Sequence, residues 1–263
     1  MANETRTLRP KNRILKAGIE LEGGWANNPP TPVIHDGSVK FPAPELRPQP
    51  MFSTTAERDA WVREEQTRLD QAQFRHIGEI VSPPMEATEP TVTDFVTANY
   101  PTAVNDTCGL HVHMSFKHRL NYQRLMTPEF TKAMVVGLRE WAEQEKLPKG
   151  HPLWPRLLDP DHRHCAHIYC GEEQSKQVSK DYQSRGKAHS RYTAINYCYN
   201  QHQTVECRLL SMMDTPEQAV RAVMEVLRIT NRFLAKVRAR ELKVGARVAT
   251  TTIPTVSRHR VTV

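Results

Sequence analysis

Three short segments alternate apolar and ionisable side chains, and this alternation constrains the fold more than any other feature of the sequence. In each segment, two ionisable residues stand at positions i and i+2 with an apolar residue between them: Glu20 and Glu22, His111 and His113, and Glu206 and Arg208. In a β-strand, residues at i and i+2 lie on the same face. Each segment therefore predicts a strand with one apolar face toward the core and one ionisable face opposite it.

The other elements predict an α+β fold. N-capping residues, prolines at first helical positions and helical spacing of apolar residues predict helices at 54–72, 91–100, 127–146 and 215–243. Alternation and turn residues predict strands at 13–22, 33–40 (a hairpin around Asp36-Gly37), 76–82, 109–116, 191–199 and 204–210. The chain lacks a strand–helix–strand rhythm, so we expect about six strands in a mostly antiparallel sheet with helices packed on its outer face.

We expect one domain to hold these elements, because 263 residues can bury a sizeable core. Its predicted extent is 13–244, between a polar N-terminal arm, 1–12, and a basic C-terminal tail, 245–263. The stretch 147–190 shows no clear periodicity, and we interpret it as a lid or substrate region.

The excess positive charge is concentrated at one end of the chain. The net charge is +7, and Arg221–Val263 holds ten Lys and Arg against two Asp and Glu, which leaves the remainder close to neutral. A basic end can bind an acidic partner such as nucleic acid. The simpler interpretation is a solvated helix face followed by a loose tail.

The composition favours a cytoplasmic protein. Met1–Arg13 is polar and lacks an apolar segment, so we expect no secretory signal there. No run of about 18 apolar residues is present, so we expect no membrane partner. Five cysteines, an odd number, argue against a disulfide framework and for a reducing compartment.

The ionisable faces predict a metal site if their strands are neighbours. One surface of the sheet would then carry four carboxylates and two imidazoles: Glu20, Glu22, Glu79 (on the 76–82 strand), Glu206, His111 and His113. Such a concentration of carboxylates is costly unless cations lie on it, and this ligand chemistry suits Mg²⁺ or Mn²⁺. A single Glu-x-Glu is more often a solvated sheet face, and a single His-x-His more often a satisfied pair. It is the coincidence of three such pairs that favours a shared site.

A second group of candidate ligands lies in the aperiodic region. His162, His164, Cys165, His167 and Cys170 fall within nine residues. This composition is compatible with structural Zn²⁺, although the spacing matches no zinc-finger pattern. A lid or substrate loop without metal is the alternative interpretation.

Six ordered segments resemble the amidoligase family, a branch of the glutamine synthetase and γ-glutamylcysteine ligase superfamily. They read KAGIELEGGW, HDGSV, HIGEIVSPPM, VNDTCGLHVHMSF, SRYTAINYCY and QTVECRLLSMMDTPE. GLHVH and TVECR are the specific motifs. The chain departs from the family pattern at Cys207, where Phe is more usual, and in a longer stretch before Glu79, so that 41–75 reads as an insertion.

The resemblance implies a curved antiparallel sheet forming a funnel, with ATP and metals on its concave face. It implies ATP-dependent joining of a carboxylate substrate to an amine substrate through an acyl phosphate. Glu20, Glu22, Glu79, His113 and Glu206 would then be ligands of Mg²⁺ or Mn²⁺. The implied catalytic residues are Arg208, Arg191 and His111, and the implied ATP- or substrate-binding residues are Arg191, Asn196, Arg208, Arg185 and Lys187. Asp36 would meet a substrate ammonium group or support a metal ligand, or is a plain turn residue.

Two other function classes stay open at the sequence level. A metal-dependent phosphodiester or peptide hydrolase could use the same carboxylates and histidines without ATP. Alternatively, the basic C-terminal helix could make the chain a nucleic-acid-binding module, although no recognised nucleic-acid motif is present. The two substrates and the oligomeric state do not follow from the sequence.

Overall fold

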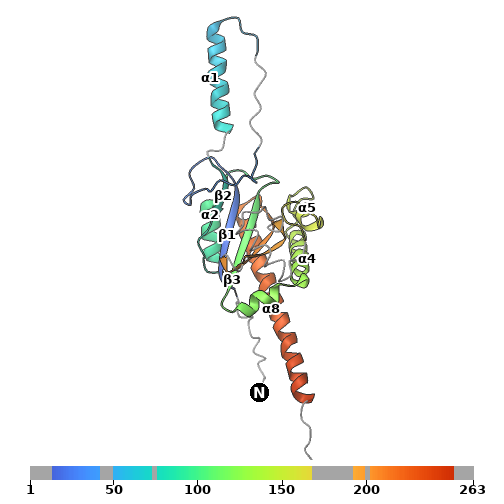
Figure 1. The fold of residues 1–263 in the computed structure, drawn as a ribbon. Helices are drawn as coiled ribbons and strands as arrows, with labels where there is room; N and C mark the ends of the chain where they lie inside the picture. The colour runs from blue at the N-terminus through green and yellow to red at the C-terminus, as the bar shows by residue number, and fades with distance from the viewer. Residues whose placement is uncertain (1–13, 42–49, 73–75, 168–191, 199–201, 252–263) are drawn as a thin grey trace, which may run out of the picture.

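The protein is described by a computed structural model that covers residues 14–41, 50–72, 76–167, 192–198 and 202–251. In these ranges the fold is α+β, with one open five-stranded antiparallel sheet and six helices (Figure 1). The strands are β1 (Ile14–Trp25), β2 (His76–Val81), β3 (Gly109–Phe116), β4 (Ile195–Cys198) and β5 (Thr204–Ser211), arranged in the order β2-β1-β3-β5-β4. The helices are α1 (Thr55–Ala72), α2 (Glu89–Asn99), α3 (Arg119–Leu125), α4 (Pro128–Gln144), α5 (Leu153–Leu158) and α8 (Pro216–Thr251).

The apolar faces of the strands form the core, as the alternation predicts. Ile19, Leu21, Leu110, Val112 and Met114 are completely buried. The long helix α8 packs against β3, where the Thr230 hydroxyl lies 3.3 Å from the Met114 sulfur. Helices α2 and α4 both pack against α8, so one helical layer covers the apolar face of the sheet.

Close approach of α4 and α8 depends on a glycine. A Cβ atom at Gly137 would lie 2.7 Å from Cδ1 of Ile229, well inside van der Waals contact. Thr127 begins α4 as its sequence predicts, because its side chain accepts a hydrogen bond from the Phe130 amide.

Three sequence-based expectations need correction. The 33–40 hairpin does not form; Ile34 makes an isolated bridge to Glu79, so the sheet has five described strands. Only Ile195–Cys198 of the expected 191–199 strand is described as a strand. Helix α8 continues to Thr251, beyond the end we expected near 243. The stretch 147–190, interpreted as a lid or substrate region, contains α5 and is described as far as residue 167.

Two helices extend from the body of the fold. Helix α1 lies apart from the sheet and the other helices, and the C-terminal half of α8 projects on the opposite side (Figure 1). The charged and weakly amphipathic sequence of α1 explains why it has no apolar face to bury.

Candidate metal centre

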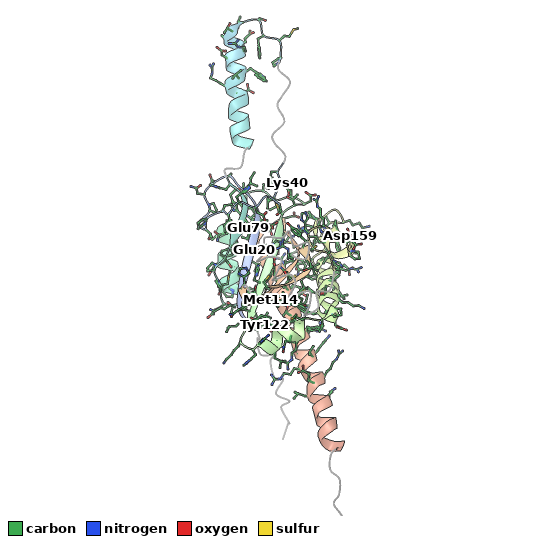
Figure 2. All side chains as sticks on the ribbon, viewed as in Figure 1. Glu20, Lys40, Glu79, Met114, Tyr122 and Asp159 are labelled. Atoms are coloured by element: carbon green, nitrogen blue, oxygen red, sulfur yellow. The ribbon has the colours of Figure 1, made fainter. Side chains whose placement is uncertain are left out.

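Strand register brings the predicted ionisable residues together on one face of the sheet. Glu20 of β1 lies opposite His111 of β3, and Glu22 lies opposite Glu79 of β2. His113 of β3 lies opposite Glu206 of β5. Figure 2 shows Glu20 and Glu79 close together in the sheet, on neighbouring strands. The convergence expected from the three alternating segments is therefore confirmed.

Glu20, His113 and Glu206 form the first metal-ligand group, which we call group 1. One ligand atom from each residue lies within 4.8 Å of the others. His113 Nε2 is 2.9 Å from Glu20 Oε1 and 4.0 Å from Glu206 Oε1. The other ring nitrogen, Nδ1, lies 3.2 Å from the Thr204 hydroxyl, and this contact orients the imidazole.

Glu22, Asp36 and Glu79 form the second group, group 2, within the same 4.8 Å limit. Asp36 is placed there by the loop between β1 and α1, because Ile34 exchanges two backbone hydrogen bonds of 2.8 Å with Glu79. The sequence singles out Asp36 for a possible site role but does not pair it with Glu22 and Glu79. The Gly109 amide donates a 2.5 Å hydrogen bond to Oε2 of Glu22, and this bond fixes the position of the Glu22 side chain.

His111 lies between the two groups and is 2% exposed. Its Nδ1 is 2.8 Å from Glu20 Oε2 and 3.6 Å from Glu206 Oε1, both in group 1. Its Nε2 is 3.6 Å from Glu22 Oε1, in group 2. Contact with three carboxylates lets this imidazole link the positions of both groups.

Arg208 and Asn196 contact group 1 from β5 and β4. Arg208 Nη1 donates to Glu206 Oε1 at 2.5 Å, and Asn196 Nδ2 donates to Glu206 Oε2 at 2.9 Å. The guanidinium also lies 5.8 Å from the centre of the Tyr192 ring, and its Nε has no hydrogen-bond partner among the described residues. The cation is thus held beside the carboxylates with one donor unused.

The bulge between β3 and β5, next to Arg208, is supported by a buried arginine that sequence reasoning did not single out. Arg156 of α5 is 1% exposed and donates to the carbonyls of Leu210 at 3.1 Å, Cys108 at 3.3 Å and Arg208 at 3.4 Å. The β3–β5 register shifts between Leu110 and Val112. There the Arg156 guanidinium supplies hydrogen-bond donors of the kind that the amides of a neighbouring strand would supply. No pattern of apolar residues reveals such a contact.

The electrostatics of the two groups differ. In group 2, burial and the charges of Glu20, Asp36 and Glu22 raise the pKa of Glu79 to about 7. In group 1, burial favours neutral Glu206, but the charges of Arg208 and His113 outweigh burial and lower its pKa. Hydrogen bonds from His111 and His113 outweigh burial at Glu20 and lower its pKa as well. Group 1 therefore has cationic partners within the chain, whereas group 2 has an excess of negative charge.

A cavity of about 420 Å³ adjoins group 1. Glu20 and His113 form part of its wall, and Lys16 contributes an amine. The remaining lining combines small and apolar residues with hydroxyl and amide side chains: Ala17, Gly18, Ile19, Val81, Ser82, Pro84, Ser115, His202, Gln203 and Thr204. A small molecule in this cavity would have its polar end against the group 1 carboxylates.

Three of the other predicted site residues, Arg185, Lys187 and Arg191, lie outside the described residues. In the proposed zinc cluster, Cys165 Sγ is 3.5 Å from His162 Nδ1, and His167 Nε2 is 2.8 Å from the Arg156 carbonyl. No three of the described cluster residues lie within ligand distance of one another, and Cys170 lies outside the described residues.

Comparisons of the chain with protein-family models, with curated proteins and with solved structures find no match. Within the described part of the chain, no helix has both the length and the apolar character needed to cross a bilayer. The site's geometry and the sequence motifs are therefore the basis for inferring a function.

Proposed function

We propose that the protein is a Mg²⁺- or Mn²⁺-dependent ligase that uses ATP to join a carboxylate to an amine. The observation that carries the proposal is the pair of oxygen-rich ligand groups side by side on one sheet face, with Arg208 at their edge. The six ordered motifs that resemble the amidoligase family support the same reaction.

The donor atoms fit hard divalent cations. Group 1 offers two carboxylates and an imidazole, and group 2 offers three carboxylates. Mg²⁺ and Mn²⁺ prefer this chemistry, whereas structural zinc sites favour thiolates and imidazoles. Burial and the charges of Glu20, Asp36 and Glu22 raise the pKa of Glu79, and a bound cation would offset this repulsion. When bound, such cations polarise phosphoryl oxygens and screen the repulsion between phosphate and carboxylate.

Arg208 suits the handling of a transferred phosphoryl group. Its Nη1 is fixed by Glu206 while its Nε is buried without a partner in the described residues. A preorganised guanidinium stabilises developing negative charge on a phosphoryl or tetrahedral oxygen without further reorganisation. In this proposal, phosphoryl transfer from ATP to the substrate carboxylate gives an acyl phosphate, and attack by the amine releases phosphate.

The cavity beside group 1 is our proposed position for the nucleotide. Its 420 Å³ volume, its apolar wall from Val81 and Pro84, and its hydroxyl and amide groups suit a flat heterocycle with polar edges. Lys16 at the wall provides a positive charge for a phosphate or a ribose hydroxyl. The substrates would then approach group 2 from the side of Asp36.

The test is substrate-dependent release of phosphate from ATP. The purified chain with Mg²⁺ and pooled amino acids or polyamines should release phosphate and form a conjugate detectable by mass spectrometry. Glu206→Ala should abolish both, whereas Glu86→Ala, an exposed carboxylate on the same chain, should not. Full turnover by Glu206→Ala would refute the assignment. Cleavage of nucleic acid or peptide without nucleotide would instead identify a metal-dependent hydrolase.

A further inference from the structure

Four cations form a stripe on α8 that has no role in the metal centre. Arg232, Lys236, Arg240 and Lys243 are all exposed, and their spacing of four, four and three residues places them on one face of the helix. At 1.5 Å per residue, this stripe, the α8 basic stripe, spans roughly 16 Å. It runs into the part of α8 that projects from the body (Figure 1).

The stripe differs from an ordinary solvated helix face because its charges form no ion pair with the part of the chain that the structure describes. Other charged residues nearby do form ion pairs: Arg221 with Glu145, Arg228 with Glu225, and Arg124 with Glu241. Within the described residues, none of the four stripe cations has a carboxylate at ion-pair distance, although Glu129 shares a groove with Arg240. Like charges at i and i+4 destabilise a helix by about 0.2–0.5 kcal/mol per pair, so the stripe is costly unless an anion neutralises it.

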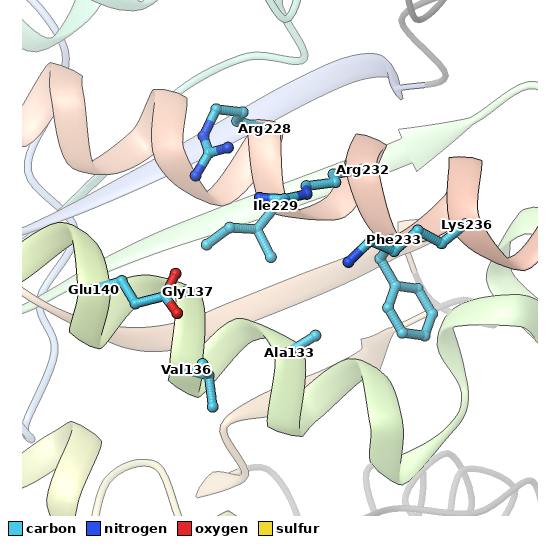
Figure 3. A pocket seen from close by; sticks show the side chains of 9 residues that line it. All are labelled: Ala133, Val136, Gly137, Glu140, Arg228, Ile229, Arg232, Phe233 and Lys236. Atoms are coloured by element: carbon cyan, nitrogen blue, oxygen red, sulfur yellow. The ribbon is translucent and has the colours of Figure 1, made fainter.

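A groove between α4 and α8 leads into the stripe. Its volume is about 210 Å³, and Figure 3 shows Arg232 and Lys236 on α8 and Ala133 and Val136 on α4 among the residues that line it. Glu140 also lines this groove, next to Arg228. The carboxylates of Glu140 and Glu225 offset the positive charge of Arg228. The positive charge that no described carboxylate offsets therefore begins at Arg232.

We propose that the α8 basic stripe binds the phosphate backbone of duplex nucleic acid. A repeat of about 6 Å between cations matches a polymer with regularly spaced negative charges. A projecting helix of about 10–12 Å diameter also fits the major groove, which is about 12 Å wide. Leu242 is the one large apolar side chain exposed between Arg232 and Lys243, so insertion into a bilayer is not favoured.

The contacts are to phosphates and carry no sequence information. The exposed residues from Lys236 to Lys243 include no asparagine or glutamine that could read a base edge. They also include no aromatic ring that could stack on a base. The interaction is therefore sequence-independent and strongly dependent on salt. The α8 basic stripe lies outside the metal centre. Binding of nucleic acid to the stripe is therefore independent of the proposed ligase reaction.

The test is the salt dependence of binding to two unrelated 20-base-pair DNA duplexes, measured by fluorescence anisotropy. Four phosphate contacts predict that affinity falls about 150-fold between 50 and 200 mM salt, with a log–log slope of about −3.6. Both duplexes should bind equally. The variant R232Q/K236Q/R240Q/K243Q should lose most of this slope, while its Mn²⁺ binding stays that of the wild type.

The matched control is K117Q/K132Q/R139Q/K149Q, which removes four exposed cations elsewhere and the same net charge. It should bind DNA like the wild type. Three outcomes overturn the proposal: an unchanged salt slope in the stripe variant, an equal loss in the control variant, or equally tight binding of polyglutamate. Binding of anionic vesicles in preference to DNA would also overturn it and would identify a membrane surface instead.

Discussion

Replacing Glu79 by Gln should stabilise the metal-free protein at pH 8. The pKa of Glu79 is raised to about 7 by burial and by the neighbouring charges of Glu20, Asp36 and Glu22. A carboxyl group whose folded-state pKa exceeds its unfolded-state value stabilises the fold while protonated, and that stabilisation is lost as the pH rises from about 4.5 to about 7. Above pH 7, the charged carboxylate therefore opposes folding.

The size of the effect follows from the two pKa values. A rise from 4.5 to about 7 corresponds to roughly 3 kcal/mol by linkage. Glu79 is only partly buried and solvent screens its charge, so we expect about half of this, near 1.5 kcal/mol. Gln keeps the shape of the side chain, resembles the protonated carboxyl in having one acceptor oxygen and one donor group, and removes the charge.

The assay is urea denaturation at pH 8 and pH 5, with and without Mg²⁺. At pH 8 without metal, Glu79→Gln should unfold at higher urea than the wild type, and the gain should shrink at pH 5. Addition of Mg²⁺ should stabilise the wild type and reverse the order of the two proteins. Glu86→Gln, an exposed carboxylate just beyond β2, is the control and should change nothing. A Glu79→Gln protein that is less stable at pH 8 without metal would refute the electrostatic reasoning.

Two further substitutions test the supports of the site. Arg156→Met should lower the free energy of unfolding by about 3 kcal/mol, because the carbonyls of Leu210 and Arg208 each lose a donor and the Cys108 carbonyl keeps only its backbone donor; an unchanged urea midpoint would contradict this account of the bulge. Gly78→Ala should weaken Mn²⁺ binding at group 2 and spare group 1 in calorimetric titration, because a Cβ there would lie 2.0 Å from the Ile34 carbonyl that positions the Asp36 loop. Equal weakening at both groups would show that the Asp36 loop has no separate role.

The period-two alternation was sufficient to predict the central sheet and most of the site. Glu20, Glu22, His111, His113 and Glu206 lie on the predicted face because strand geometry is local and the core requires the apolar residues on the other side. Strand order follows from tertiary packing and cannot be obtained from alternation alone; the coincidence of three such pairs favoured neighbouring strands, and the resemblance to a known family added to it.

The parts that sequence reasoning missed depend on contacts between distant segments. The 33–40 hairpin was wrong because Ile34 pairs with Glu79 instead of with its own neighbours, and this pairing brings Asp36 to group 2. Arg156 bonds to backbone carbonyls, which have no side-chain signature. The C-terminal helix is longer than expected because Gly245 lies inside α8 and does not cap it.

The central claim is that the ionisable sheet face holds two divalent cations, and a Mn²⁺ titration monitored by electron paramagnetic resonance tests it most directly. The account predicts two bound ions per chain, with Glu206→Gln losing the ion at group 1 and Glu79→Gln losing the ion at group 2. A chain that binds no Mn²⁺, or whose stoichiometry is unchanged by both substitutions, would contradict it.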